Sequence, residues 1–419
     1  MQCEALPRDL KVDLCRKVRG FVIGMGTGLT EEYALTLVRK WRDFGGVQKK
    51  RKIERVTINP LSVADLGFLS VVYNVILTFD DESEFQYIVK IPSSDRLNAD
   101  VTTGAEQQAM EELLIIMHNR ECLLYEILKD IDVPIPKLYA CKEISHTDKA
   151  GYVVMESFIG RATVMGLTAQ ITAQQAFVLA KTLGKLQAEM EKVPKNLWAD
   201  LNDTFRVEKD LVTPMVEPHS EMLIKYDPAT FRPLIEKSKP FMNPQFTRYV
   251  KQIKAKELGV DSLVHSDLHG GNTMFQTNSD GSISNKLVTI FDWQSGAAGN
   301  SLCDLAGFTF MSVDPEVRRG CQQELMDTFY DTYVTNSKCP NPKFTKEVCQ
   351  ELYELAMIQA GLEWLMNFGF FATKPVGKNQ AQSEAIVARM ALRARFALED
   401  SLKLMEKHDC HKIMKRLRE

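Results

Sequence analysis

The sequence lacks the cysteine spacing of disulfide-linked and zinc-stabilised proteins. Its nine cysteines are an odd number, lie scattered from Cys3 to Cys410, and include no C-x-x-C pair. A disulfide framework or a structural zinc site would need paired, regularly spaced cysteines. We therefore expect reduced thiols and a cytoplasmic location.

The sequence also lacks a long apolar run. No stretch approaches the roughly 20 apolar residues that a membrane-spanning helix needs. The first residues, MQCEALPRDLKVDLCRKVRG, are charged throughout and contain no apolar core of a signal peptide. We expect a protein with no membrane span.

An excess of either charge is missing as well. The formal net charge of -3 on 419 residues gives no overall attraction to nucleic acid. The basic run KKRKIER, Lys49 to Arg55, fits either a localisation or nucleic-acid signal or a solvated strand edge. We favour the strand edge and expect no nucleic-acid partner. With 45% hydrophobic and 26% charged residues, the composition is that of a globular protein, and 419 residues are enough for two domains or lobes of enzyme size.

The region from about residue 53 to 91 has the pattern of an antiparallel sheet. The run SVVYNVILTF (70–79) alternates between two faces, and FQYIVKIP (85–92) is a second β-rich run after the turn DDES. The preceding RKIERVTI supplies a third strand, and GYVVMESFIG (151–160) supplies a final buried one.

A long helix is predicted over about 105–130, followed by mostly helical sequence to the end of the chain. Glu121 falls inside the apolar stripe of this helix. A carboxylate on a packing face is costly unless a cation meets it. Lys90 is the nearest candidate on a strand. A lysine at a strand end is by itself more simply a solvated charge, and Glu121 has the alternative of lying on the helix surface.

One hairpin interrupts the helical region. The runs NTMF and KLVTIFDW flank the turn QTNSDGSISN, which has the residues of a tight turn. In an antiparallel hairpin the residue that enters the first strand lies beside the residue that leaves the second. This places Asn272 next to Asp292, with Asp267 on the loop that leads to the same edge.

The stretch HSDLHGGN allows two interpretations. His265, Asp267 and His269 alternate like the ligands of a zinc or iron site. Alternatively, Asp267, Asn272 and Asp292 bring oxygen ligands to one edge, which suits Mg²⁺ and phosphate. The hairpin favours the second interpretation.

Phosphoryl transfer would use the other candidates too. This reaction needs metal ions on the phosphates, a lysine on the nucleotide, and a carboxylate that orients or deprotonates the attacking hydroxyl. Lys90 can hold the α and β phosphates, Glu121 can orient Lys90, and Asp267 can act on the hydroxyl. ATP and Mg²⁺ are therefore the expected cofactors.

The ordered motifs resemble the protein-kinase-like fold, and in particular its small-molecule branch of choline kinases and aminoglycoside phosphotransferases. Within that branch, YIVKIP, HNRECLLYEIL, GYVVMESFIG and IFDWQSGAAGNSLCDLAGF are most similar to the CHK kinase-like, or ecdysteroid kinase-like, family of insects and nematodes. The resemblance covers about residues 50–370. It implies an α+β fold with two lobes, a small antiparallel β-rich N-lobe and a larger, mainly helical C-lobe.

The resemblance also implies a division of the chain into three segments. Residues 1–50 would form an N-terminal helical extension. Residues 51–160 would form the β-rich nucleotide-binding N-lobe, which ends in the hinge. Residues 161–419 would form the helical C-lobe with the catalytic loop and the acceptor pocket.

Individual roles follow from the same resemblance. Asp267 would be the catalytic base, supported by His265, and Asn272 and Asp292 would bind magnesium, with Asn272 also serving catalysis. Lys90 and Glu121 would form the ion pair that anchors the phosphates.

The nucleotide would also contact two backbone segments. The stretch GFLS, Gly67 to Ser70, matches the family's short glycine loop, whose N–H groups would cap the phosphates. The backbone from Glu156 to Phe158 would be the hinge that meets adenine.

Three positions leave alternatives open. Ser266 stands where relatives usually have glycine, and it is the more demanding residue if φ is positive there. His269 stands where an aromatic residue is common, and it either faces the acceptor pocket or covers the loop. Asp304 either completes a capping box with Ser301 or steadies the catalytic loop, as the resemblance implies; we favour the capping box.

We predict an ATP-dependent phosphotransferase that acts on a hydroxyl of a small molecule, such as a steroid, glycoside or other secondary metabolite. A catalytically inactive kinase-like binding or scaffold protein is the alternative, and a metal-dependent hydrolase built on the two histidines and Asp267 is a third hypothesis. Trp364, Phe368, Phe370 and Phe371 fit helical core or, if they face the acceptor, a hydrophobic lining. No pattern indicates an oligomeric state.

Overall fold

The computed structural model describes residues 28–61, 69–93, 104–203, 213–373 and 379–419. Contacts divide the chain into two compact units. The N-terminal unit comprises Met1–Cys122 and Lys137–Ser157, and the C-terminal unit comprises Leu123–Pro136 and Phe158–Glu419. The predicted segment boundaries near residues 50 and 160 stay a prediction.

The N-terminal unit contains one five-stranded antiparallel sheet in the order β1-β2-β3-β5-β4. Its strands and two short helices are α2 (Glu31–Val38), α3 (Phe44–Gln48), β1 (Ile53–Pro60), β2 (Ser70–Phe79), β3 (Glu84–Pro92), β4 (Leu138–Lys142) and β5 (Tyr152–Glu156). The strands predicted from alternation are confirmed as β1, β2, β3 and β5. The sequence analysis missed β4, because this five-residue strand follows a proline-rich stretch and carries no alternating pattern.

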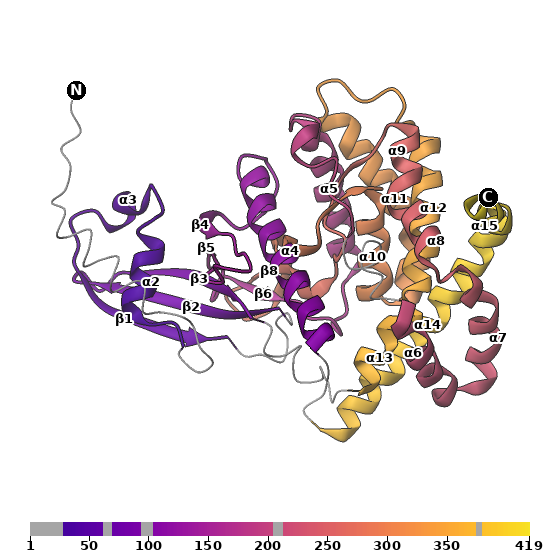
Figure 1. The fold of residues 1–419 in the computed structure, drawn as a ribbon, viewed down its shortest axis with the longest axis horizontal. Helices are drawn as coiled ribbons and strands as arrows, with labels where there is room; N and C mark the ends of the chain where they lie inside the picture. Colours follow the sequence, from indigo (N-terminus) through magenta and orange to yellow (C-terminus); the bar gives the residue numbers. More distant parts are fainter. Residues whose placement is uncertain (1–27, 62–68, 94–103, 204–212, 374–378) are drawn as a thin grey trace. The chain divides into compact units, whose positions relative to one another are not determined.

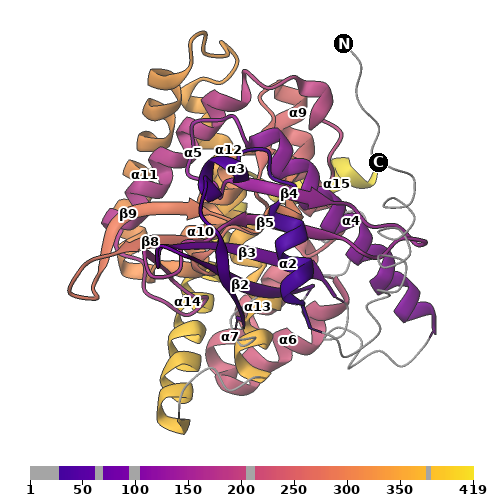
Figure 2. The same ribbon diagram turned by 90° about the vertical axis from the view of Figure 1, so that its left-hand side faces the viewer.

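Helices α2 and α3 cover one face of this sheet (Figures 1 and 2). Ala34 and Leu37 of α2 are fully buried against Val75 and Leu77 of β2. The hydroxyl of Tyr87 on β3 donates to the Ala34 carbonyl at 2.9 Å, which ties the helix to the sheet. Thr30 caps α2 by accepting from the Tyr33 N–H.

Helix α4 (Gly104–Leu128) confirms the long helix predicted over about 105–130. It crosses the division between the two units after Cys122. Its buried residues include Leu113, Met117 and Glu121, and Glu121 is only 1% exposed. The helix thus presents a carboxylate on a packing face, as the sequence indicated.

The C-terminal unit is mainly helical, with two small antiparallel sheets of order β6-β8-β9 and β10-β7. Its strands are β6 (Ala162–Val164), β7 (Ser262–Val264), β8 (Thr273–Thr277), β9 (Ile283–Ile290) and β10 (Ala297–Gly299). Its α-helices are α5 (Ala173–Met190), α6 (Thr213–Tyr226), α7 (Pro228–Ser238), α8 (Pro244–Arg248), α9 (Lys254–Leu258), α10 (Leu302–Ser312), α11 (Pro315–Asn336), α12 (Lys346–Leu362), α13 (Trp364–Thr373), α14 (Gln380–Lys407) and α15 (Cys410–Arg418). An N-terminal antiparallel sheet with a larger helical part confirms the predicted fold class.

Close helix packing forms the core of the C-terminal unit. Helices α5 and α11 lie side by side in both views (Figures 1 and 2). A Cβ atom on Gly184 of α5 would overlap the Phe329 carbonyl of α11, so only glycine permits this approach. Trp364, Phe368 and Phe371 on α13 are at most 3% exposed, which favours the helical-core interpretation for these three residues, whereas Phe370 is 36% exposed.

The predicted hairpin is confirmed as β8 and β9. Thr273 pairs with Ile290, and Gly281 adopts a φ of 82° in the turn. Two short 3₁₀-helices lie at the open end of the hairpin, η6 (Gly270–Asn272) before β8 and η7 (Trp293–Ser295) after β9. The hairpin therefore brings the segment before β8 and the segment after β9 to one edge.

Candidate active site

The N-terminal unit contains the predicted ion pair. The Lys90 ammonium on β3 lies 2.9 Å from Glu121 Oε1 and 2.7 Å from Glu121 Oε2. The lysine and glutamate side chains are 10% and 1% exposed. The strand register sets the lysine between Val72 of β2 and Val153 of β5. Burial this deep means that neither charge is tolerable without the other.

The predicted nucleotide-binding segments are placed in part. Gly67 lies outside the described residues. Ser70 begins β2 and is 8% exposed. In the hinge, Glu156 is the last residue of β5, and Phe158 is the second residue beyond it. Their assignment to the phosphates and to adenine stays a prediction.

In the C-terminal unit, His265 follows β7 and is fully buried. Its Nε2 lies 2.8 Å from the Phe291 carbonyl, so Nε2 must carry the proton and donate it. Its Nδ1 then accepts from the Asp267 N–H at 3.3 Å. Both ring nitrogens are engaged, and the ring packs 4.8 Å from that of Trp293. His265 therefore connects the loop that follows β7 to Phe291, the residue directly after β9.

Asp304 on α10 holds the same loop from a second side. Its carboxylate accepts the His265 N–H at 2.7 Å and the Ser266 N–H at 3.0 Å. The favoured capping box was wrong, because the Ser301 side chain makes no capping bond. The tertiary bond to the loop satisfies two buried amides that a local cap would not reach. Burial raises the pKa of the Asp304 carboxyl, against the opposing effects of His265 and of the two N–H donors.

Two non-glycine residues of the site have left-handed backbone conformations. Ser266 and Asp292 both have a φ of 67°. Such a conformation costs an L-residue about 1 kcal/mol or more. The Asp304 bond holds Ser266, while the Tyr125 hydroxyl accepts the Asp292 N–H at 3.2 Å. Position 266 therefore has the positive φ at which serine is more strained than glycine.

The backbone register at the hairpin edge brings Asn272 and Asp292 close together, in agreement with the predicted hairpin. The Phe291 N–H donates to the Asn272 carbonyl at 3.1 Å, which makes Asp292 the next residue along this edge. The Asn272 side-chain amide donates from Nδ2 to the Asp267 carbonyl at 2.8 Å. That bond commits the amide nitrogen and leaves Oδ1 as the atom that can face a cation. An amide oxygen and a carboxylate are hard oxygen donors, so these residues fit Mg²⁺.

Asp267 lies on the loop between the histidines with its side chain 39% exposed. The Oδ2 atom lies 3.8 Å from His269 Nε2. The Nδ1 atom of His269 accepts the Gly271 N–H at 3.0 Å, so this side chain folds back on its own loop. Of the two alternatives for His269, the contacts favour the one in which it covers the loop.

The histidine-based metal cage is not supported. Both ring nitrogens of His265 are hydrogen-bonded to backbone groups. In the described ranges, no group of three His, Cys, Asp or Glu residues has the geometry of a metal site. The hydrolase hypothesis depended on that cage and loses its basis.

Sequence reasoning missed two residues that hold this site. The first is Tyr125, whose hydroxyl accepts the Asp292 N–H. The second is Ser312, whose hydroxyl accepts the Gly270 N–H at 2.8 Å. In the sequence Tyr125 is one more apolar-stripe residue of the long helix α4, and no local pattern distinguishes Ser312.

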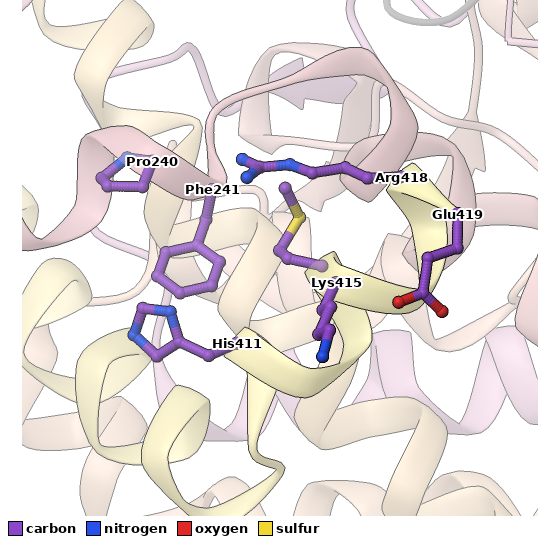
Figure 3. A pocket seen from close by; sticks show the side chains of 7 residues that line it. Pro240, Phe241, His411, Lys415, Arg418 and Glu419 are labelled. Atoms are coloured by element: carbon purple, nitrogen blue, oxygen red, sulfur yellow. The ribbon is translucent and has the colours of Figure 1, made fainter.

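One surface pocket of about 330 Å³ lies at the C-terminal helix (Figure 3). Pro240 and Phe241 line it from one side, and basic residues of α15 line it from the other. It contains none of the predicted site residues. Its cationic side chains are exposed, so it has no buried polar group to select a ligand.

A family described as "Uncharacterized oxidoreductase dhs-27" matches residues 81–409 of the chain. The chain belongs to this family, DUF1679. The ecdysteroid kinase-like resemblance of its motifs is thereby confirmed. A curated DUF1679 relative, the uncharacterized oxidoreductase dhs-27 of Caenorhabditis elegans, is 24% identical over 282 residues. That match covers 63% of this chain and 33% of the relative, so the chain spans about a third of the relative's length.

Among solved structures, the DUF1679 chain is similar to small-molecule phosphotransferases. Choline kinase from Cryptosporidium parvum has 12% identity and a TM-score of 0.45, with 86% of this chain and 91% of that chain covered. The GDP and kanamycin complex of APH(2")-IIIa has 14% identity and a TM-score of 0.44, with 88% and 98% covered. Spectinomycin phosphotransferase APH(9)-Ia, in complex with ADP and spectinomycin, has 14% identity and a TM-score of 0.43, with 86% and 98% covered.

Membrane insertion through a helix finds no support in this DUF1679 chain. Within the described ranges, no helix combines the length and the apolar character that crossing a membrane requires.

Proposed function

We propose that this protein is an ATP-dependent phosphotransferase that moves the γ-phosphate of ATP to a hydroxyl of a small molecule. The observation that supports the proposal most strongly is the arrangement of Asp267, Asn272 and Asp292 at the hairpin edge. There the Asn272 amide nitrogen is fixed on the Asp267 carbonyl, and Asp292 follows the residue that pairs with Asn272. A base, an amide oxygen and a carboxylate at one edge are the parts that phosphoryl transfer requires.

In this mechanism Asp267 orients the acceptor hydroxyl and takes its proton as the oxygen bonds to the γ-phosphorus, while the bond from the γ-phosphorus to the β–γ bridging oxygen breaks and ADP leaves. Its side chain is 39% exposed, so an acceptor can reach it. Asn272 and Asp292 hold Mg²⁺, which neutralises charge on the phosphates when bound. His265 and Asp304 keep the loop amides fixed, so the base does not reorganise during the reaction.

Lys90 has the role of pairing with the α and β phosphates. A lysine that serves only stability would not need to be buried against a carboxylate, because such a pair is no more stabilising than a well-packed apolar pair. Glu121 keeps the ammonium in one position and charged. The Gly67–Ser70 loop and the hinge from Glu156 to Phe158 complete the nucleotide site in this proposal.

The name of the curated relative raises oxidoreductase activity as another possibility. A nicotinamide-dependent oxidoreductase would bind its dinucleotide on a parallel sheet with crossover helices. All three sheets in the described residues are antiparallel. This favours phosphoryl transfer over hydride transfer for the present chain.

A screen for the acceptor tests the proposal. Purified protein, ATP and Mg²⁺ are incubated with a mixture of hydroxylated metabolites that includes steroids and glycosides, and mass spectrometry follows the gain of one phosphate. We expect one class of alcohol to be phosphorylated by the wild type and not by Asp267→Asn. Tight binding of a metabolite without any transfer would instead support the inactive binding-protein alternative.

A further inference from the structure

A buried arginine far along the chain contacts the supports of the catalytic loop. Arg393 on α14 is 1% exposed. It donates from Nη1 to the Met311 carbonyl at 2.6 Å and from Nη2 to the Ala169 carbonyl at 3.0 Å. Nη2 also reaches the Ser312 carbonyl at 3.3 Å, and Nε and Nη2 donate to Asp314 Oδ1 at 3.1 and 2.8 Å. One guanidinium thus joins the end of α10 to the segment that precedes α5.

Asp314 binds Arg393 instead of capping its own helix. It is the N-cap of α11, but its side chain makes no capping bond. An aspartate cap would contribute about 1 kcal/mol to the helix. Instead the carboxylate binds Arg393 through Oδ1 and accepts from Gln170 Nε2 at 2.6 Å through Oδ2. The Asp314 carboxylate therefore binds Gln170 of segment 165–171 and does not cap its own helix.

The segments that Arg393 holds both touch Gly270. The Ser312 hydroxyl accepts the Gly270 N–H in a buried bond of 2.8 Å. A Cβ atom on Gly270 would lie 2.7 Å from the Gly166 carbonyl, so the backbone of segment 165–171 packs directly on this residue. Gly270 begins the single 3₁₀ turn that ends at Asn272. Displacing either segment would tilt the turn that carries the Asn272 amide.

We infer that Arg393 is a positioning residue for the metal-binding end of the site. It acts through Ser312 and segment 165–171 on Gly270, and thereby on Asn272. The inference rests on the proposed function, because it assigns Asn272 to magnesium. A lysine cannot replace the guanidinium, since an ammonium has no planar fork to reach three carbonyls and a carboxylate together.

Arg318 on α11 offers a matched control. It is 2% exposed and pairs with Asp400 of α14 at 2.7 Å, and its guanidinium stacks 3.9 Å from the Phe310 ring. None of the side-chain hydrogen bonds found for Arg318 reaches segment 165–171 or residues 311–314. Arg318→Lys should therefore cost comparable stability without moving Gly270.

The experiment compares Arg393→Lys with Arg318→Lys by two measurements. Amide hydrogen exchange is followed over residues 165–171 and 268–273, and Mn²⁺ affinity is titrated by electron paramagnetic resonance in the presence of ADP. We expect Arg393→Lys to accelerate exchange in both segments and to weaken Mn²⁺ binding roughly 10- to 100-fold, as loss of a group behind a metal ligand does. Arg318→Lys should change neither, and ADP affinity without metal should be equal in all three proteins.

Unchanged exchange and Mn²⁺ affinity in Arg393→Lys, or equal changes in both variants, would overturn the inference. If the wild type binds no Mn²⁺ with ADP, the proposed function fails, while hydrogen exchange still decides whether Arg393 fixes the loop. Asp314→Asn serves as the second variant if Arg393→Lys does not fold. It removes the charge of the Arg393 partner, so we expect faster exchange in the same segments.

Discussion

The candidate residues of the two units are held in different ways. In the N-terminal unit, one bidentate ion pair between Lys90 and Glu121 fixes the functional group, and both members are side chains on regular elements. In the C-terminal unit, backbone amides are fixed by Asp304, Ser312 and Tyr125, and Ser266 is among the residues with a left-handed φ. The position of the Lys90 ammonium thus depends on charge balance, whereas the position of the loop residues depends on backbone conformation.

This difference separates the effects that substitutions should have. Removing one charge from the ion pair leaves the other buried and uncompensated, so the main effect should be a loss of folding stability. Removing a loop support lets the backbone relax, so metal binding and turnover fall while the fold survives. The predictions below are ordered from the largest expected effect to the smallest.

Asp292→Asn should have the largest effect on turnover. It replaces the carboxylate at the hairpin edge by an amide of the same shape and removes the charge proposed to hold Mg²⁺. We expect turnover to fall about 10³-fold, the scale of losing one preorganised electrostatic group, with an unchanged melting temperature. Turnover within tenfold of the wild type would show that this carboxylate does not hold the metal.

The ion pair should respond to single and double replacement in opposite ways. Glu121→Leu leaves the Lys90 ammonium buried without its partner and should cost about 3–5 kcal/mol in the free energy of unfolding. The double variant Lys90→Met with Glu121→Leu should recover most of that stability. Urea denaturation measures both.

Phosphate transfer distinguishes function from structure for the same pair. The double variant should remain at least about 100-fold less active than the wild type, because no cation is left for the nucleotide. A stable double variant with full activity would reduce Lys90 and Glu121 to a structural pair.

Asp304→Asn should weaken the catalytic loop rather than the whole fold. The amide keeps one oxygen for the two N–H donors of His265 and Ser266, so one buried amide loses its partner. The cost should be about 1–3 kcal/mol, and amide exchange at residues 265–267 should accelerate. An unfolded variant, or unchanged exchange in this stretch, would contradict the assigned role.

Ser266→Gly should have the smallest effect and the opposite sign. Glycine adopts a φ of 67° without the steric penalty that serine incurs. The greater freedom of glycine in the unfolded chain offsets part of this gain, so we expect the free energy of unfolding to rise by up to about 1 kcal/mol. Ser266→Ala, which keeps the strain and the N–H bond, is the control and should not be stabilised.

Sequence patterns predicted the parts of the site that depend on periodicity. The β-rich run after the turn DDES placed Lys90 on a strand, and the turn residues around Gly281 placed Asn272 beside Asp292. Glu121 was found because a carboxylate in an apolar stripe must have a partner. Each of these inferences needs only local spacing and one requirement for charge compensation.

Tertiary bonds between distant segments could not be predicted in the same way. The spacing of Ser301 and Asp304 fits a capping box as well as a loop support, and only the fold brings His265 within reach of the carboxylate. Arg393 lies on a long amphipathic helix where arginine is ordinary. Its bonds to carbonyls of two other segments leave no trace in the local sequence.

Calorimetric titration of Mg²⁺·ATP tests the central claim most directly. The wild type should bind the complex, binding should require the metal, and Asp292→Ala should weaken it at least about tenfold, the effect of losing a charged group from a metal or phosphate site. Absence of Mg²⁺·ATP binding by the folded wild type, or equal binding by Asp292→Ala, would contradict the assignment of a phosphotransferase site to Lys90, Asn272 and Asp292.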